Sequence, residues 1–275
     1  MSARPWRVSW DVGDARVPQR RSGAIIRLVQ VPLRPVLRAM ARHRWIDADR
    51  LPQQGGAVLC GNHLGPFDAF AFGYLMQAQG IAPRFLAKES LFRLPLLGAL
   101  IRGSGQIPVL RGTARSADAL TAAQAALEDG SALMVFPEGT YSRDPRRWPM
   151  RGRLGAARLA LQTGAPMYPI ACWGSHLLWP HGVLLPRLWP RRTITMRVGE
   201  PIHLEQAEGE TELQAVVRGT EEVLDAITAL LATTRGEEPP VQRYDPRKDA
   251  HRPEEGRPAR TGLAVLLGSR WKGNR

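Results

Sequence analysis

Short apolar runs alternate along this chain with longer segments of helical periodicity, and this alternation constrains the fold more than any other feature. We expect strands at residues 57–60, 83–88, 107–111, 132–136, 168–173 and 193–198. We expect helices at residues 69–76, 116–129, 154–163 and 210–232. Strands and helices in alternation are typical of a parallel sheet covered by helices. The sequence therefore predicts an α/β fold: a single domain with a mixed, largely parallel β-sheet flanked by helices.

Basic residues concentrate at the two ends of the chain, whose formal net charge is +13. Residues 1–50 contain eleven Arg and four Asp, and residues 234–275 contain ten Arg or Lys and six acids, so the middle is nearly neutral. We expect a loosely ordered N-terminus at 1–22, a basic amphipathic segment at 23–45, a folded domain at 46–233 and a disordered tail at 234–275. Basic ends suit an anionic surface, either membrane or nucleic acid, or serve solubility alone.

Two segments carry apolar bulk that a membrane would accept. In residues 23–45 apolar positions alternate with Arg, and such a segment either lies in the headgroup layer or packs on the domain. Residues 176–190, which include Trp179 and Trp189, either enter a bilayer interface or cover the core. No run of 18 apolar residues and no uninterrupted signal-peptide core is present, so we predict no transmembrane helix and a protein that faces the cytoplasm.

The two cysteines, Cys60 and Cys172, both lie in apolar runs. We therefore expect reduced, buried thiols rather than a disulfide. The central part of the chain lacks an interleaved pattern of aromatic and basic residues, so nucleic acid ranks lowest among the partners considered.

The stretch from Gly61 to Asp68 joins the first apolar run to a helical pattern and carries His63 and Asp68 five positions apart. Gly65 and Pro66 supply a turn that would let the two side chains meet. A neutral imidazole accepts a proton near physiological pH, and a carboxylate on its other nitrogen fixes the tautomer. The spacing alone favours a simpler interpretation, in which Asp68 caps the helix that follows it.

A second candidate segment follows the strand expected at 132–136. After Pro137 comes Glu138, followed by Gly139 and Thr140, an arrangement by which open α/β sheets present ligand-binding groups. Lys88 and Arg111 stand at the ends of two other expected strands. Taken alone, these two cations are interpreted as surface charges.

Three motifs, taken together, carry a resemblance to a known family. Asn62-His63-x-x-x-x-Asp68, the segment from Phe136 to Thr140, and Tyr168-Pro169-Ile170 resemble, in order and spacing, the motif blocks of the glycerolipid acyltransferases, which include the lysophosphatidic acid acyltransferases. The match covers residues 55 to 203. It implies transfer of a fatty acyl chain from acyl-CoA or acyl carrier protein to the free hydroxyl of a lysophospholipid, with 1-acylglycerol-3-phosphate as first candidate, in phospholipid synthesis.

The resemblance also assigns roles to residues. His63 becomes the general base that deprotonates the acceptor hydroxyl, and Asp68 orients its imidazole. Lys88 and Arg111 are implied to contact the acceptor phosphate. The implied acceptor-binding residues of the third motif are Glu138, Gly139 and Thr140. No metal, no cofactor beyond the acyl donor and no acyl-enzyme is expected. The domain at 46–233 is then the acyltransferase domain, bound peripherally or monotopically to the cytoplasmic face of the cell membrane.

One position departs from the family pattern and keeps alternatives open. Tyr141 stands where many lysophosphatidic acid acyltransferases carry Arg, which puts the acceptor phosphate in question. The alternatives are an acyltransferase on glycerol-3-phosphate or a glycolipid, and a non-catalytic membrane-binding protein. We also expect an apolar tunnel for the acyl chain beside His63, lined at helical spacing by Leu91, Leu94, Leu97 and Leu100.

Overall fold

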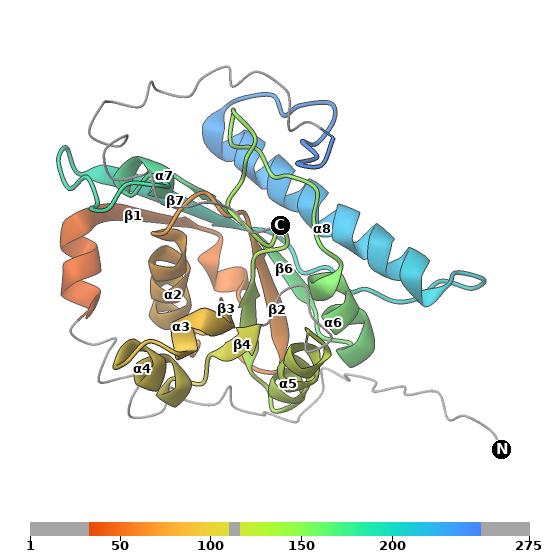
Figure 1. The fold of residues 1–275 in the computed structure, drawn as a ribbon. Coiled ribbons are helices and arrows are strands. Elements are labelled where there is room, and N and C mark those ends of the chain that lie inside the picture. The colour runs from red at the N-terminus through yellow and green to blue at the C-terminus, as the bar shows by residue number, and fades with distance from the viewer. Residues whose placement is uncertain (1–32, 110–115, 249–275) are drawn as a thin grey trace.

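The computed structural model describes residues 33–109 and 116–248, which form one α/β domain (Figure 1). Residues 33–40 are helical and lead directly into the first strand. The strands are β1 (Ala41–Ile46), β2 (Ala57–Gly61), β3 (Arg84–Lys88), β4 (Ile107–Val109), β5 (Ala132–Val135), β6 (Met167–Trp173) and β7 (Arg192–Val198). The helices are η1 (Ala48–Arg50), α2 (Asp68–Ala78), α3 (Glu89–Phe92), α4 (Leu97–Gly103), α5 (Ser116–Glu128), α6 (Gly155–Thr163), α7 (Ser175–Leu178) and α8 (Glu212–Arg235).

The strands form one sheet in the order β1-β7-β6-β2-β5-β3-β4. All neighbouring strands pair in parallel except β6 and β7, which pair antiparallel. The strands β1 and β7 therefore run opposite to the other five. The predicted fold class, a mixed and largely parallel sheet flanked by helices, is confirmed.

Strand β2 lies in the middle of the sheet and positions the residues that follow it. Every residue of β2 is buried, because helices cover both faces of the sheet. Ala57 and Leu59 belong to the core on one face, whereas Val58 and Cys60 belong to the core on the other. This burial on both sides explains why the strand reads as an unbroken apolar run.

The helices form a layer on each face of the sheet. One layer contains the helix at 33–40, α2 and α7, whose buried side chains pack in one core cluster with residues of β1, β2, β6 and β7. The other layer contains α5, α6 and α8 (Figure 1). Gly130 and Gly164, which follow α5 and α6, both have positive φ, as expected for glycines that end helices.

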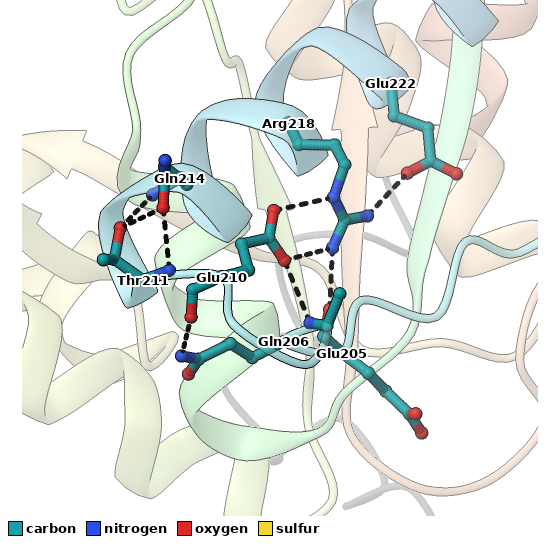
Figure 2. A network of polar contacts seen from close by, with 8 residues as sticks. Glu205, Gln206, Glu210, Thr211, Gln214, Arg218 and Glu222 are labelled. Carbon is teal, nitrogen blue, oxygen red and sulfur yellow. Dashed lines mark hydrogen bonds and ion pairs between the residues drawn. The ribbon is translucent and has the colours of Figure 1, made fainter.

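Helix α8 begins at a polar network that Figure 2 shows in detail. Thr211 and Gln214 form a capping box, in which the Thr211 side chain accepts a hydrogen bond from the Gln214 N–H and the Gln214 side chain accepts one from the Thr211 N–H. Arg218 donates two hydrogen bonds, of 3.0 and 2.9 Å, to the carboxylate of Glu210. These bonds lower the pKa of Glu210 to about 2. The network fixes the point at which the 24-residue helix starts.

The predicted amphipathic segment at 23–45 requires a correction. Within its described part, residues 33–40 are helical and pack on the domain through the buried side chain of Leu37. Residues 41–46 are not part of that helix but form the edge strand β1, paired with β7. Alternation of buried Ala41 with exposed Arg42 and Arg44 is a strand pattern that resembles a basic amphipathic helix in sequence.

The predicted disordered tail at 234–275 is wrong at its start. Helix α8 continues to Arg235, and the segment after it folds back on the same helix, where Arg243 forms ion pairs with Glu221 and Asp225. The carbonyl oxygen of Tyr244 also accepts a hydrogen bond of 3.0 Å from the N–H of Arg151. The expectations for residues 1–22 and 249–275 fall outside the described residues.

The state of the two cysteines and the character of the helices were also predicted from the sequence. Cys60 and Cys172 are free and buried, as predicted, and burial raises the pKa of the Cys60 thiol to about 12. Within residues 33–109 and 116–248, no helix combines the length and apolar character that crossing a bilayer would require.

Candidate active site

The side chains of His63 and Asp68 meet at the end of β2. Nδ1 of His63 lies 2.8 Å from Oδ2 of Asp68. The two residues come together because the connection at 62–67 turns tightly, with the N–H of Asp68 donating to the carbonyl oxygen of Gly65 at 3.2 Å. The imidazole is 17% exposed and the carboxylate is completely buried. The structure thus brings together the two residues predicted to be catalytic.

Asp68 holds the connection as well as the imidazole. Its Oδ2 atom also accepts hydrogen bonds from the backbone N–H groups of Leu64, at 2.5 Å, and Gly65, at 2.8 Å. Asp68 is the first residue of α2, where the helix dipole favours negative charge. The N-cap residue is Phe67 and makes no capping hydrogen bond through its side chain, so the interpretation of Asp68 as a simple N-cap is wrong.

Aromatic rings fix the plane of the His63 imidazole. It stacks on Phe136 with ring centroids 3.9 Å apart and an interplanar angle of 9°. Tyr141 lies on it at 4.3 Å and 58°. Because Asp68 occupies Nδ1 and the rings hold the plane, Nε2 is the nitrogen that remains for a substrate.

Asn62 links the end of β2 to the neighbouring strand β6. Its side-chain nitrogen donates to the carbonyl oxygen of Cys172 at 3.0 Å, and its side-chain oxygen accepts from the Cys172 N–H at 2.7 Å. The amide side chain thus replaces a backbone peptide and prolongs the pairing of the two strands. This buried contact sets the position of the residue directly before His63.

Glu138 links the His63 turn to the segment after β5. Oε1 of Glu138 accepts the N–H of His63 at 3.0 Å, and Oε2 accepts the N–H of Met150 at 3.0 Å. The carboxyl group is buried, and this burial raises the pKa of Glu138 to about 8. A further hydrogen bond of 2.7 Å joins the N–H of Ser142 to the carbonyl oxygen of His63. The Glu-Gly-Thr turn and the His63 turn therefore form one unit.

Gly139 permits close packing at the tip of the turn. Its φ is +69°, which favours glycine, and a Cβ atom there would lie 2.6 Å from Cδ and Nε of Arg153. The Arg153 side chain, which is exposed, therefore lies across Gly139. Thr140 follows and is partly buried. The guanidinium of Arg153 and the backbone of Gly139 and Thr140 thus lie beside the His63 turn.

Of the two cations predicted to bind phosphate, the structure describes the position of one. Lys88 is the last residue of β3, at the same edge of the sheet as the ends of β2 and β5, since the three strands are parallel neighbours. Arg111 falls outside the described residues. Neither prediction of a contact with phosphate is tested by the geometry.

The continuous helical spacing predicted for the tunnel lining is wrong, and the side chains of Leu91 and Leu94 are exposed. The cause is a break in the expected helix. The helix α3 ends at Phe92 and α4 begins at Leu97, and Leu96 between them has a φ of 61°. Helical spacing therefore does not carry across this segment.

Several residues of the site were not identified from the sequence. Asn62 and Tyr141 were noted without a structural role, and Ser142 and the backbone N–H of Met150 were missed. Their partners lie far along the chain or are backbone groups, so the sequence pattern contains no signal for them. In the part of the chain that the structure describes, no three His, Cys, Asp or Glu side chains gather as a metal site.

The geometry can support proton transfer. A fixed imidazole with a buried carboxylate on one nitrogen and a partly exposed face is suited to act as a general base on a hydroxyl group. The backbone around Gly139, with Arg153 across it, is suited to hold a polar or anionic substrate beside that base.

Comparisons with known proteins agree with this chemistry. The family model described as Acyltransferase matches residues 42–173, which include both turns of the site. A 1-acyl-sn-glycerol-3-phosphate acyltransferase of Limnanthes douglasii is 34% identical over 149 residues, which are 54% of this chain and 50% of that protein. An enzyme with the same name from Borreliella burgdorferi is 29% identical over 132 residues, or 47% of this chain and 50% of that protein. The chain thus spans about half the length of these curated relatives.

A solved structure has the same fold. The 1-acyl-sn-glycerophosphate (LPA) acyltransferase PlsC from Thermotoga maritima superimposes with a TM-score of 0.52. The superposition covers 72% of this chain and 79% of that chain, at 22% sequence identity. At this identity the likeness establishes the α/β architecture.

Proposed function

This chain belongs to the acyltransferase family, and from that premise we propose that it moves a fatty acyl chain from acyl-CoA or acyl carrier protein to the free hydroxyl of a lysophospholipid in phospholipid synthesis. The first candidate acceptor is 1-acylglycerol-3-phosphate, after the names of the relatives. The single observation that carries the proposal is the contact of 2.8 Å between His63 and the buried Asp68.

The reaction needs one base and no covalent enzyme intermediate. Nε2 of His63 takes the proton of the acceptor hydroxyl as its oxygen attacks the thioester carbonyl carbon. Asp68 keeps the proton on Nδ1 and stabilises the imidazolium that forms. When the carbon–sulfur bond breaks, the imidazolium returns the proton to the leaving thiolate. The products are the acylated acceptor and the free thiol of the carrier.

Acceptor binding is proposed to use the turn after β5. Gly139 and Thr140 offer backbone and hydroxyl groups next to His63, and Lys88 and Arg111 are proposed to bind the acceptor phosphate. The role of Glu138 differs from that of a direct ligand, since both of its oxygens bind backbone N–H groups. We propose that Glu138 instead holds the His63 turn and the acceptor-binding turn in a fixed relative position.

The proposed reaction draws no metal or cofactor into the mechanism beyond the acyl donor itself. Its acceptor is a membrane lipid, so we also propose that the protein binds peripherally to the anionic cytoplasmic face of the cell membrane. The excess of Arg supports this location by charge attraction to anionic lipids.

The decisive experiment is an activity matrix of acyl donors and acceptors with the wild-type chain and His63→Ala. We expect turnover with acyl-CoA or acyl carrier protein and a lysophospholipid, reduced on the order of 10³-fold in His63→Ala. His63→Ala should still bind lipid vesicles as the wild type does. Full activity of this variant would reject His63 as the base.

A second candidate acceptor follows from Tyr141, which by the family resemblance stands where many lysophosphatidic acid acyltransferases carry Arg, and which contacts the ring of His63. An uncharged ring at this position would suit glycerol-3-phosphate held by other cations, or a glycolipid. The same matrix separates these acceptors. If no donor and acceptor pair gives turnover that depends on His63, the remaining alternative is a non-catalytic membrane-binding protein.

A further inference from the structure

The connection between α7 and β7 exposes a series of large apolar side chains. Leu184 is 84% exposed, Leu185 70%, Leu188 53% and Trp189 88%. They lie within seven residues, 183–189, which we name the apolar loop. In Figure 1 the chain after α7 projects beyond the end of the sheet formed by β1 and β7. So much exposed apolar surface in one loop indicates a surface that another apolar phase covers.

Hydrogen bonds at the base hold the apolar loop in one shape. The N–H of Arg187 donates to the carbonyl oxygen of Leu178 at 2.6 Å. The indole N–H of Trp179 donates to the carbonyl oxygen of Val183 at 2.9 Å. Trp179 also stacks on Phe70 of α2, with centroids 6.4 Å apart. The leucines are therefore presented to solvent by a structured base.

The charged residues that flank the apolar loop in the sequence are all positive. From residue 145 to residue 199 the sequence contains no Asp and no Glu. Arg187 and Arg191 are exposed, and Arg191 donates hydrogen bonds to the carbonyl oxygens of Arg38 and Ala41, the latter at 3.1 Å. Arg38 of the helix at 33–40, which is exposed, thus lies beside Arg191 just after the end of the loop. Exposed Leu and Trp flanked by Arg match an interface between anionic headgroups and acyl chains.

The apolar loop also lies next to the candidate active site. The ring of Tyr141 contacts His63 at 4.3 Å on one side and His181 at 4.9 Å on the other. His181 is two residues before Val183, where the loop begins. A membrane that receives the loop would therefore lie close to His63.

From these observations we infer that the apolar loop docks the protein on an anionic lipid bilayer and delivers the His63 site to lipid at the membrane surface. The inference rests on the proposed function, because the acceptor of that reaction is itself a membrane lipid. The leucines and Trp189 enter the interface between headgroups and acyl chains, while Arg187 and Arg191 bind lipid phosphates. The loop does not span the bilayer.

The first test is co-sedimentation of the full chain with zwitterionic vesicles and with vesicles that contain an anionic lipid. We expect the double variant Leu184→Glu and Leu185→Glu to bind anionic vesicles at least about tenfold more weakly, since two apolar side chains become charged. The matched control is Leu213→Glu with Val217→Glu, which changes two exposed apolar residues of α8 in the layer on the other face of the sheet. This control should bind as the wild type does.

The second test uses Trp189→Phe, a conservative change that should preserve the fold. Lipids with brominated acyl chains quench tryptophan that enters the bilayer, so we expect part of the quenching seen with the wild type to be absent from the variant. Equal quenching in both proteins, or equal vesicle binding by the loop variant and the α8 control, overturns the inference. A wild-type dimer in solution that the glutamate variant does not form would also overturn the inference, because the loop would then mediate self-association.

These tests separate the inference from the proposed reaction. The loop variant should retain turnover on a short-chain acceptor dissolved in water and lose turnover on vesicle-bound acceptor. His63→Ala should show the opposite pattern, binding vesicles without turnover on either acceptor. If His63→Ala retains activity while the loop variant loses vesicle binding, the reaction is rejected and the docking surface stands.

Discussion

Asp68 approaches the Nδ1 atom of His63 to 2.8 Å from the first turn of α2, and it is completely buried while the imidazole remains partly exposed. Two backbone N–H groups of the intervening turn bind the same carboxylate oxygen. One oxygen thus both closes the turn and selects the tautomer of the proposed base, His63. A change at Asp68 should therefore act on chemistry through the orientation of His63.

Asp68→Asn should reduce kcat on the order of 10³-fold, because a neutral amide neither stabilises the imidazolium nor fixes the productive tautomer. KM for the acceptor should change much less, since Asp68 is buried beneath the imidazole and out of reach of the substrate. Steady-state kinetics with saturating acyl donor measure both constants. Circular dichroism and a urea titration of the same variant establish that it is folded. A large rise in KM with an unchanged kcat would contradict the assignment.

The buried carboxyl group of Glu138 should make stability depend on pH. Its pKa is about 8 in the folded protein, because burial disfavours the charged form, against an ordinary value of 4.5. Between these two values the folded state binds a proton that the unfolded state has lost, so the free energy of unfolding should fall as pH rises. The slope from this group is at most about 1.4 kcal/mol per pH unit.

Between pH 6.5 and 8 the pH dependence of stability caused by Glu138 can be measured without a contribution from His176. Burial, followed by the charge of Arg147, lowers the pKa of His176 from 6.5 to about 4 in the folded protein, so this residue makes stability rise with pH only below 6.5. Urea titrations across pH 6.5 to 8 should show a falling free energy of unfolding for the wild type and a flatter line for Glu138→Gln. The exposed-residue control Glu222→Gln should follow the wild type. A wild-type line without slope would reject the buried, protonated state.

Much of the fold could be predicted because local physics dictates it. The burial of both faces of β2 produced an apolar run, and glycines at positive φ marked the ends of α5 and α6. The contact between His63 and Asp68 could be predicted for the same reason, because the two residues are five positions apart and a Gly-Pro turn lies between them. The family resemblance gave the chemistry, which the spacing alone did not.

The rest depends on contacts between distant parts of the chain. The Asn62 side chain binds Cys172, 110 positions away, and Glu138 binds the N–H of His63, 75 positions away. The strand β1 becomes a strand only because β7, some 150 residues later, pairs with it. A single sequence shows the residue types at such positions and gives no sign of their partners.

Arg235→Lys should destabilise the protein by about 1–2 kcal/mol. The Arg235 guanidinium lies between two indoles, 4.1 Å from the ring centroid of Trp148 and 4.2 Å from that of Trp173. An ammonium group keeps the charge but cannot stack on both rings. Urea titrations at constant m-value give the difference in the free energy of unfolding. Arg93→Lys is the control. Arg93 follows α3 and forms an exposed ion pair with Glu89, so this variant should change the free energy of unfolding by less than about 0.5 kcal/mol.

Tyr141→Arg should shift acceptor preference towards phosphorylated lipids. Tyr141 contacts the His63 ring at 4.3 Å, so a guanidinium there would lie beside the attacking hydroxyl and could bind an acceptor phosphate through paired hydrogen bonds. We expect the ratio of kcat/KM for a phosphorylated acceptor to that for an uncharged one to rise about tenfold, mainly through KM. Competition between the two acceptors with one acyl donor measures this ratio directly.

The control for this change is Tyr141→Phe, which keeps the ring against His63 and removes only the hydroxyl. If the ring sets the preference by excluding charge, Tyr141→Phe should leave the acceptor ratio unchanged while Tyr141→Arg raises it. If the phenolic hydroxyl instead binds the acceptor, both variants should alter the ratio. An unchanged ratio in Tyr141→Arg would mean that the phosphate lies away from this ring and is bound by other cations, for which Arg153 across Gly139 is one candidate.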